Sequence, residues 1–224
     1  MALITCAGAD VLRLRVHMPQ RRAWWGWLDL DTATAPSGKV QIAAAGGMTL
    51  VGTIKQPSGV FLDSARVRVV SGAGGLDTII APAAYENAQL GDPLRAVLAN
   101  AGETLSGTVS AAVTSVFLTK WTLTATPAAH AIDELCYAAS AQLGQAIGWR
   151  VLSDGTVWLG AESWPSQKIP TGADLLESAP AEGRYVIGAA SPFLLPGVNL
   201  AGVGNVVGVD HWVTHSQVRS DAWI

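Results

Sequence analysis

The first seventy residues follow the two-residue period of β-strands, and this pattern restricts the fold more than any other feature of the chain. Apolar and charged side chains alternate in three stretches, which are Leu12, Leu14 and Val16 against Arg13 and Arg15, Leu28 and Leu30 against Asp29 and Asp31, and Val67 and Val69 against Arg66 and Arg68. Such alternation predicts strands with one buried face. Turn residues separate them at Pro36-Ser37-Gly38, Gly46-Gly47 and Pro57-Ser58-Gly59. Five or six short strands at this spacing predict a small barrel or sandwich.

Two helices are predicted after the glycine cluster at positions 72, 74 and 75. Asp92 and Pro93 are typical of an N-cap followed by proline at the first helical position, and Gly102 is a typical helix stop. The apolar face of this short helix holds Leu94, Val97, Leu98 and Ala101. A longer helix is expected from Thr126-Pro127 to Gly148, with an apolar stripe of Ile132, Leu135, Cys136, Ala139, Leu143 and Ala146. The stripe predicts that Cys136 is a core residue.

Residues 148–160 predict a β-hairpin with a tryptophan in each strand. Asp154-Gly155 supplies the two positive φ angles that a two-residue hairpin turn requires. That turn would pair Val151 with Trp158, so that Trp149, Val151 and Trp158 form one cross-strand cluster. We expect this cluster to be part of the scaffold.

A β pattern returns from about Ala173, over residues 184–187, 203–214 and 217–223. The expected fold class is therefore mainly β with an α+β insert, in which two small β-barrel modules flank a segment of two helices and the β-hairpin. The expected modules are a first β-barrel at 1–80, a helical insert with the hairpin at 81–170, and a second β-barrel at 171–224.

The composition is apolar and nearly neutral. Half of the 224 residues are hydrophobic, 14% are charged, and the formal net charge is −3. A nucleic-acid-binding protein would carry a basic surface, so sequence-specific nucleic acid is not an expected partner. A surface with so few charged residues is typical of a protein that is covered by other subunits.

Neither a disulfide framework, a metal site nor a cofactor site is indicated by the sequence. Cys6 and Cys136 belong to no CxxC motif or Cys/His cluster, which suits folding in a reducing cytosol. Residues 1–5 lack the basic and apolar regions of a signal peptide. Residues 185–209 carry no charge, but Pro192, Pro196 and five glycines would interrupt a membrane helix, so strands and turns are expected there.

We expect structural roles, and not metal binding or catalysis, for the histidine and carboxylate pairs of the sequence. His211 and His215 have the i, i+4 spacing of zinc-protease helices, but Trp212-Val213-Thr214 favours a strand, where their Cα atoms would lie roughly 13 Å apart. A structural or interface role is therefore expected. Asp29 and Asp31 share one strand face and could act in glycoside hydrolysis, yet no third polar group accompanies them.

Other candidate catalytic sites have even less support in the sequence. His130, Asp133 and Cys136 lie near one another on the second helix, but a buried thiol lacks an activating environment. Residues 72–77 lack the third glycine of a dinucleotide-binding fingerprint and are expected to form a loop. No common nucleophile, phosphate-loop or zinc-protease motif occurs, which favours a protein that is not an enzyme.

Nine tryptophans, far above the usual share, are distributed along the chain. Several are in phase with apolar strand faces, so core and subunit interfaces are favoured over a sugar-binding row. The candidate interface or structural residues are Trp25, Trp27, Trp149, Trp158, Trp164 and Trp212.

Several segments resemble the baseplate hub proteins of long-tailed bacteriophages and gene transfer agents. They are Trp25 to Leu30, Val67 to Leu76, Ala101 to Ser106 after the first helix, the hairpin with Trp164-Pro165, and the ending from Val206 to Trp223. Together they span most of the chain.

The resemblance implies a structural component of the virion tail tip, made in the cytoplasm of the bacterial host. Such hubs are homotrimers in which two similar barrels per subunit match the sixfold tail tube. The implied partners are the distal tail or tail-tube protein, the C-terminus of the tape measure protein, and further hub or spike proteins. The implied role is to join tube to tip and to open the channel for DNA ejection. The alternative is a tail-associated protein that binds or hydrolyses cell-wall polysaccharide.

Overall fold

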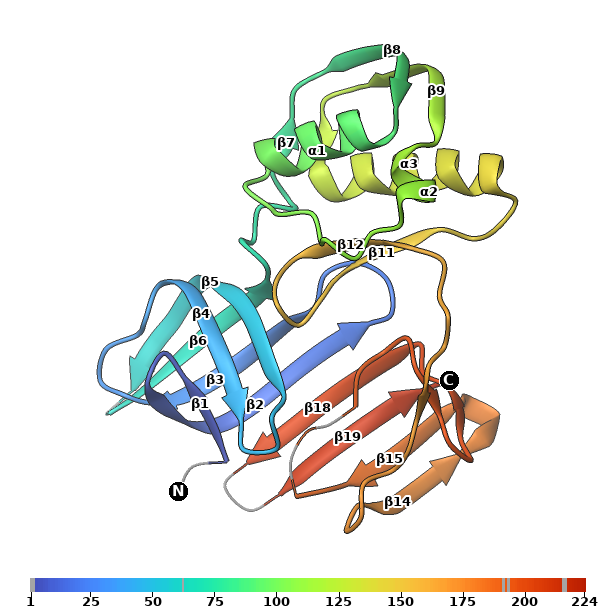
Figure 1. The fold of residues 1–224 in the computed structure, drawn as a ribbon. Coiled ribbons are helices and arrows are strands. Elements are labelled where there is room, and N and C mark those ends of the chain that lie inside the picture. The colour runs from blue at the N-terminus through green and yellow to red at the C-terminus, as the bar shows by residue number, and fades with distance from the viewer. Residues whose placement is uncertain (1–2, 62, 191, 193, 215–216) are drawn as a thin grey trace. The chain divides into compact units, whose positions relative to one another are not determined.

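The computed structural model describes residues 3–61, 63–190, 192, 194–214 and 217–224. Its chain contacts define two compact units, one formed by residues 1–71 and 163–224 and the other by residues 72–162 (Figure 1). The expected fold class is confirmed, because strands predominate and helices occur within the insert. The division at 80 and 170 stays a prediction. No helix in the described part of the chain is long and apolar enough to span a bilayer.

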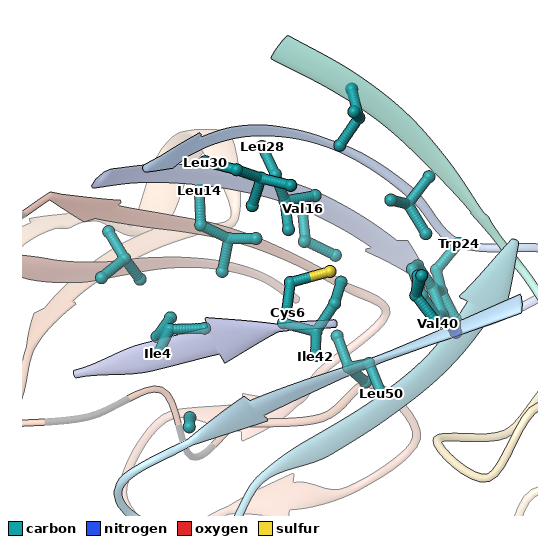
Figure 2. Close-up of a cluster of buried hydrophobic side chains, with 14 of the residues drawn as sticks. Ile4, Cys6, Leu14, Val16, Trp24, Leu28, Leu30, Val40, Ile42 and Leu50 are labelled. Atoms are coloured by element: carbon teal, nitrogen blue, oxygen red, sulfur yellow. The ribbon is translucent and has the colours of Figure 1, made fainter. Parts of the chain in front are cut away.

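Six strands of the first unit form a closed barrel. They are β1 (Ile4–Cys6), β2 (Ala9–Pro19), β3 (Trp25–Asp31), β4 (Gly38–Ala44), β5 (Thr49–Phe61) and β6 (Ser64–Ser71). Their order is β1-β4-β5-β6-β3-β2, and β1 also pairs with β2, which closes the sheet. Alternate side chains fill the interior, as Figure 2 shows for Leu14, Val16, Leu28 and Ile42. The alternation of the sequence thus predicted the inner face of the barrel.

Two details of this barrel differ from the expectation. Leu12 is 42% exposed, because the register between β2 and β3 shifts between Val11 and Arg13 and takes Leu12 out of the inward-facing series. Pro57-Ser58-Gly59 is not a turn between strands but lies inside β5, where the pairing with β6 shifts between Pro57 and Gly59. Proline is tolerated at such bulges because the ladder is already interrupted there.

Four C-terminal strands continue the sheet of the barrel: β14 (Asp174–Ala179), β15 (Arg184–Gly188), β18 (Gly208–Thr214) and β19 (Val218–Trp223). Three short strands, β13 (Ser166–Gln167), β16 (Asn199–Leu200) and β17 (Gly204–Asn205), form a separate sheet, and a 3-10 helix η1 lies at Pro180–Glu182. Strand β18 pairs with β2, and the row continues β18-β19-β15-β14. A separate core of Ile187, Leu194, Leu200, Val206, Val209 and Ala222 lies in this module. Two modules with separate cores therefore share one ten-stranded sheet.

The second unit packs its helices with short two-stranded sheets. Its elements are β7 (Ile79–Ile80), β8 (Ala83–Gln89), α1 (Gly91–Asn100), α2 (Ala111–Thr114), β9 (Phe117–Leu123), β10 (Thr126–Pro127), α3 (Ala128–Leu143), β11 (Gly148–Val151) and β12 (Val157–Gly160). Strands β8 and β9, β7 and β10, and β11 and β12 form antiparallel pairs. Helix α2, which the sequence analysis did not predict, begins after Ser110, whose side chain accepts from the backbone N–H of Ala112.

The predicted apolar faces of α1 and α3 are confirmed, but some of their predicted ends are wrong. Leu90 rather than Asp92 occupies the N-cap of α1. Asp92 lies in the first turn, where its negative charge interacts favourably with the helix dipole. Helix α3 ends at Gly144, whose φ of +64° suits a C-terminal glycine, and not at Gly148. Ala146 is consequently exposed, whereas Cys136 is buried as expected.

The hairpin forms, but its register differs from the prediction by one residue. The loop has three residues: the N–H of Gly155 donates to the carbonyl of Leu152, and the N–H of Leu152 donates to the carbonyl of Thr156. Val151 therefore pairs with Val157 rather than with Trp158. Gly155, with a φ of +82°, supplies the positive φ that ends such a loop. The predicted cluster of Trp149, Val151 and Trp158 is wrong, because one extra loop residue moves Trp158 to the other face.

Glu103 anchors the glycine loop that precedes β7. Its carboxylate accepts the N–H of Ala73 at 2.9 Å and that of Gly75 at 2.8 Å, and the side chain is almost completely buried. The loop expected at residues 72–77 is thus confirmed. The two hydrogen bonds join this loop to the segment that follows α1. Two of the segments that resemble the hub proteins, Val67 to Leu76 and Ala101 to Ser106, are therefore in contact.

Replacing Glu103 with glutamine is expected to lower the free energy of unfolding by about 1–2 kcal/mol, because a neutral amide offers one acceptor oxygen where two N–H groups need partners. Denaturant unfolding followed by circular dichroism measures this change. The control is Glu86→Gln, at an exposed position on β8. Equal stability of both variants would contradict the anchoring role.

Candidate interaction surface

A row of alternating arginine and tryptophan side chains crosses the outer face of the shared sheet. Pairing across five strands places Arg219, Trp212, Arg15, Trp27 and Arg68 side by side, from β19 through β18, β2 and β3 to β6. We call these five residues the Arg/Trp ladder. Their neighbours along the strands face the interior, which is why the ladder faces outward.

The ladder is held by contacts between neighbouring side chains. The guanidinium carbon of Arg15 lies 4.1 Å from the ring centroid of Trp212, within the range of a cation–π interaction. Trp212 is still 39% exposed. Arg219 donates to the carboxylate of Asp221 at 2.6 and 2.8 Å, which ties one end of the ladder to its strand.

An open hollow of about 520 Å³ lies beside the ladder on the same face. Its walls are Arg13, Arg15, Trp27, Asp29, Arg66 and Trp212. Asp29 accepts two hydrogen bonds from Arg66, at 2.6 and 3.0 Å, and Arg13 approaches the same carboxylate to 4.0 Å. The hydrogen bond from Arg66 to Asp29, aided by the carboxylate charge, raises the pKa of Arg66. The hollow is therefore lined by two indole side chains and by charged groups with an excess of positive charge.

Trp25 lies in the next row of the same face. His17, on β2 opposite Trp25, hydrogen-bonds through Nδ1 to Asp210 at 2.8 Å, and its ring centroid is 5.8 Å from that of Trp25. The indole N–H of Trp223 donates to the other oxygen of Asp210 at 3.1 Å. Three of the six candidate tryptophans, Trp25, Trp27 and Trp212, therefore share one surface of the sheet.

The other three candidates lie elsewhere. Trp149 is 2% exposed and donates its indole N–H to Asp133 at 2.7 Å, so it is a core residue of the second unit. Trp158 is half-buried on the opposite face of the hairpin, under the guanidinium of Arg150 at 4.5 Å. Arg150 also pairs with Glu162. Trp164 is half-buried and has a φ of +50°, which non-glycine residues rarely adopt.

The hypotheses of catalytic and metal sites are not supported by the placement of their residues. His211 lies on strand β18, as expected, and its side chain is completely buried. His215 lies outside the described residues. Asp29 is engaged by Arg66, whereas Asp31 is exposed at the end of β3. In the described part of the chain no group of three His, Cys, Asp or Glu side chains could hold a metal ion.

Burial also explains the state of the Cys6 thiol and of His211. Desolvation raises the pKa of the Cys6 thiol to about 11, which keeps it protonated and unreactive. The Nε2–H of His211 donates to the carbonyl of Leu194 at 2.9 Å, so Nδ1 accepts from the hydroxyl of Ser220 at 2.8 Å. This network fixes the neutral ring between two strands and the loop at Leu194.

Asp221 joins the C-terminal strands. Burial would raise the pKa of Asp221, but hydrogen bonds from Arg219 and Arg184, together with their charges, lower it below its usual value. Arg184 also contacts Glu177 on β14 at 3.1 Å. This charged cluster links three neighbouring strands at the end of the ladder.

Two features of the surface and core escaped the sequence analysis. The ladder itself was missed because strand register, which a sequence alone does not give, decides that Trp212 lies beside Arg15. Trp24 is 1% exposed in the barrel core. Gly52, in the middle of β5, could have indicated this burial, because a glycine within a strand often marks a place where another group packs closely against the backbone. A Cβ atom at Gly52 would lie 2.8 Å from the Trp24 ring.

Three solved structures share this architecture over almost the whole chain. The 43 kDa tail protein of prophage MuSo2 from Shewanella oneidensis aligns with a TM-score of 0.68 and 9% identity, covering 98% of this chain and 96% of that one. The tail protein of Neisseria meningitidis MC58 aligns with a TM-score of 0.62 and 10% identity, covering 98% and 95%. The chain has the fold of phage tail proteins.

The third structure extends the tail-protein fold to a secretion apparatus. It is the E. coli c3393 protein, a component of the type VI secretion system with structural similarity to the T4 bacteriophage tail proteins gp27 and gp5. It aligns with a TM-score of 0.64 and 14% identity over 98% of this chain and 75% of that one. No family model and no curated protein sequence matches the chain. The tail-protein fold is therefore visible in the structure and not in sequence identity.

Proposed function

We propose that this protein is a structural component of a phage tail tip and forms the trimeric baseplate hub. In this role it joins the sixfold tail tube to the threefold tip and gates the channel through which DNA is ejected. The proposal makes it a virion protein without enzymatic activity. Its partners are two further copies of the chain, the distal tail or tail-tube protein, the C-terminus of the tape measure protein, and other hub or spike proteins.

The single observation that carries this proposal is the match of the tail-protein fold over 98% of the chain. The arrangement of the first unit supports it, because two β-modules with separate cores lie on one sheet. A threefold ring with two such modules per subunit would present six similar modules, which is what a sixfold tube requires. The second unit would then serve as a lateral spacer of the ring.

A cell-wall polysaccharide hydrolase is the less favoured alternative. A carboxylate mechanism needs two carboxyl groups that face a common cleft. Asp29 is instead bound by Arg66 through two hydrogen bonds, which disfavours its use as a nucleophile or base. We therefore assign no catalytic residue.

Quantitative mass spectrometry of purified tailed particles tests the hub role. We expect about three copies of this chain per particle, because one threefold ring contains three, against a number of tail-tube subunits that is a multiple of six. The tail-tube protein of the same particles is the internal standard. Absence from intact particles, or a copy number that follows the length of the tube, would contradict a hub at the tip.

A further inference from the structure

We propose that the Arg/Trp ladder and the adjacent hollow bind an acidic segment of a partner protein. The carboxylates of the partner would meet the guanidinium groups of Arg13 and Arg15, and its apolar side chains would contact the indoles of Trp27 and Trp212. The inference does not depend on a place in a tail, because it follows from the chemistry of this face.

The hollow carries more arginine than carboxylate side chains. Three arginines and one aspartate line the hollow, and Asp29 is already bound by Arg66. Arg68 adds a further exposed guanidinium in the ladder. The side chain of Arg13 is 66% exposed, and its Nε lies 4.0 Å from the carboxylate of Asp29, which is a long distance for an ion pair. The hollow is thus positive on a chain with a net charge of −3, which favours an acidic partner.

The ladder is built from the two residue types that are typical of interface hot spots. Tryptophan and arginine dominate the energetics of protein interfaces, because they bury a large area and offer directed hydrogen bonds. Trp212 leaves 39% of its surface exposed at the point where the ladder meets the hollow. A hollow of about 520 Å³ has room for a few partner side chains and not for a folded domain.

The covered ring of Trp212 favours a protein partner over a glycan or a nucleic acid. Sugars and bases bind tryptophan by stacking on an open ring face. The guanidinium of Arg15 already lies over the ring of Trp212 at 4.1 Å. One face of the Trp212 ring is therefore already covered, whereas the guanidinium groups of Arg13 and Arg15 are exposed, and guanidinium groups bind carboxylates through paired hydrogen bonds.

Peptide titration tests the inference on the full chain. The probe is a synthetic peptide of repeated Glu-Glu-Leu triplets, titrated calorimetrically at low and at physiological salt. We expect binding that weakens with salt. The variant Arg15→Glu should weaken it about tenfold or more, since the charge at the centre of the ladder is reversed. The matched control is Lys39→Glu, which reverses an exposed charge on β4 of the same barrel and should leave binding unchanged.

The comparison peptide consists of Gln-Gln-Leu triplets, and oligothymidylate and cell-wall glycan fragments are titrated in parallel. Because Arg15 is exposed, its variant should retain the thermal midpoint of the parent, which circular dichroism checks. Three results would overturn the proposal: no binding of the acidic peptide at low salt, equal loss in both charge variants, or tighter binding of the nucleotide or glycan than of the acidic peptide.

Discussion

The replacement of Trp149 by alanine is expected to lower the free energy of unfolding of the second unit by about 3–5 kcal/mol. The indole is 2% exposed, and its N–H donates to Asp133 on α3, so the change leaves a large cavity and removes a hydrogen bond to a carboxylate. Denaturant unfolding, together with amide hydrogen exchange of α3, measures the loss and locates it in this unit.

Trp158→Ala is the matched control in the same hairpin. Trp158 lies on the opposite face, half-buried under Arg150, so its removal should cost about 1 kcal/mol. The two-residue turn expected from the sequence would have put both tryptophans in one cluster. Similar losses in the two variants would therefore support that register and contradict the three-residue loop.

Acidification is expected to weaken the first unit through His211, by about 3 kcal/mol between pH 6.5 and pH 4. Complete burial lowers the pKa of His211 to about 4, although the hydrogen bond to Leu194 and the charge of Asp210 oppose the shift. The unfolded chain binds this proton near pH 6.5, before the folded chain does. The contribution of the neutral ring is thus fully present above pH 6.5 and lost as the pH falls to about 4.

The variant His211→Gln isolates this contribution, because glutamine does not titrate. It should be less stable than the parent at pH 7, and its stability should fall less between pH 6.5 and pH 4. Parallel denaturant titrations across this range give the difference, in which the acid groups common to both proteins cancel. Parallel curves for the two proteins would show that His211 is not held neutral by the fold.

Local pattern was a good guide wherever one face of an element had to be buried. The period of two in Leu14, Val16 and Leu28 identified the inner face of the barrel, and the stripe that contains Cys136 identified the buried face of α3. The ends of elements were less well predicted. Gly148 was predicted as the helix stop, but α3 ends at Gly144, and the segment beyond it places Ile147 and Trp149 in the core.

The hairpin shows how much depends on a single loop residue. Asp154-Gly155 indicated the turn correctly, but the same dipeptide fits a two-residue loop and the end of a three-residue loop. Because side chains alternate across a strand, this choice decides which tryptophan is buried. The structure buries Trp149 and leaves Trp158 beside Arg150.

The sequence by itself determined that this is a mainly β protein with a helical insert, that Cys136 lies in a core, and that several tryptophans lie on strand faces. Only the tertiary structure decided which strands are neighbours. The pairing of β18 with β2 puts Trp212 against Arg15, nearly two hundred positions apart, and so creates the ladder and its hollow. The physical reason is that periodicity is a property of neighbouring residues, whereas register between distant strands depends on how the whole core closes.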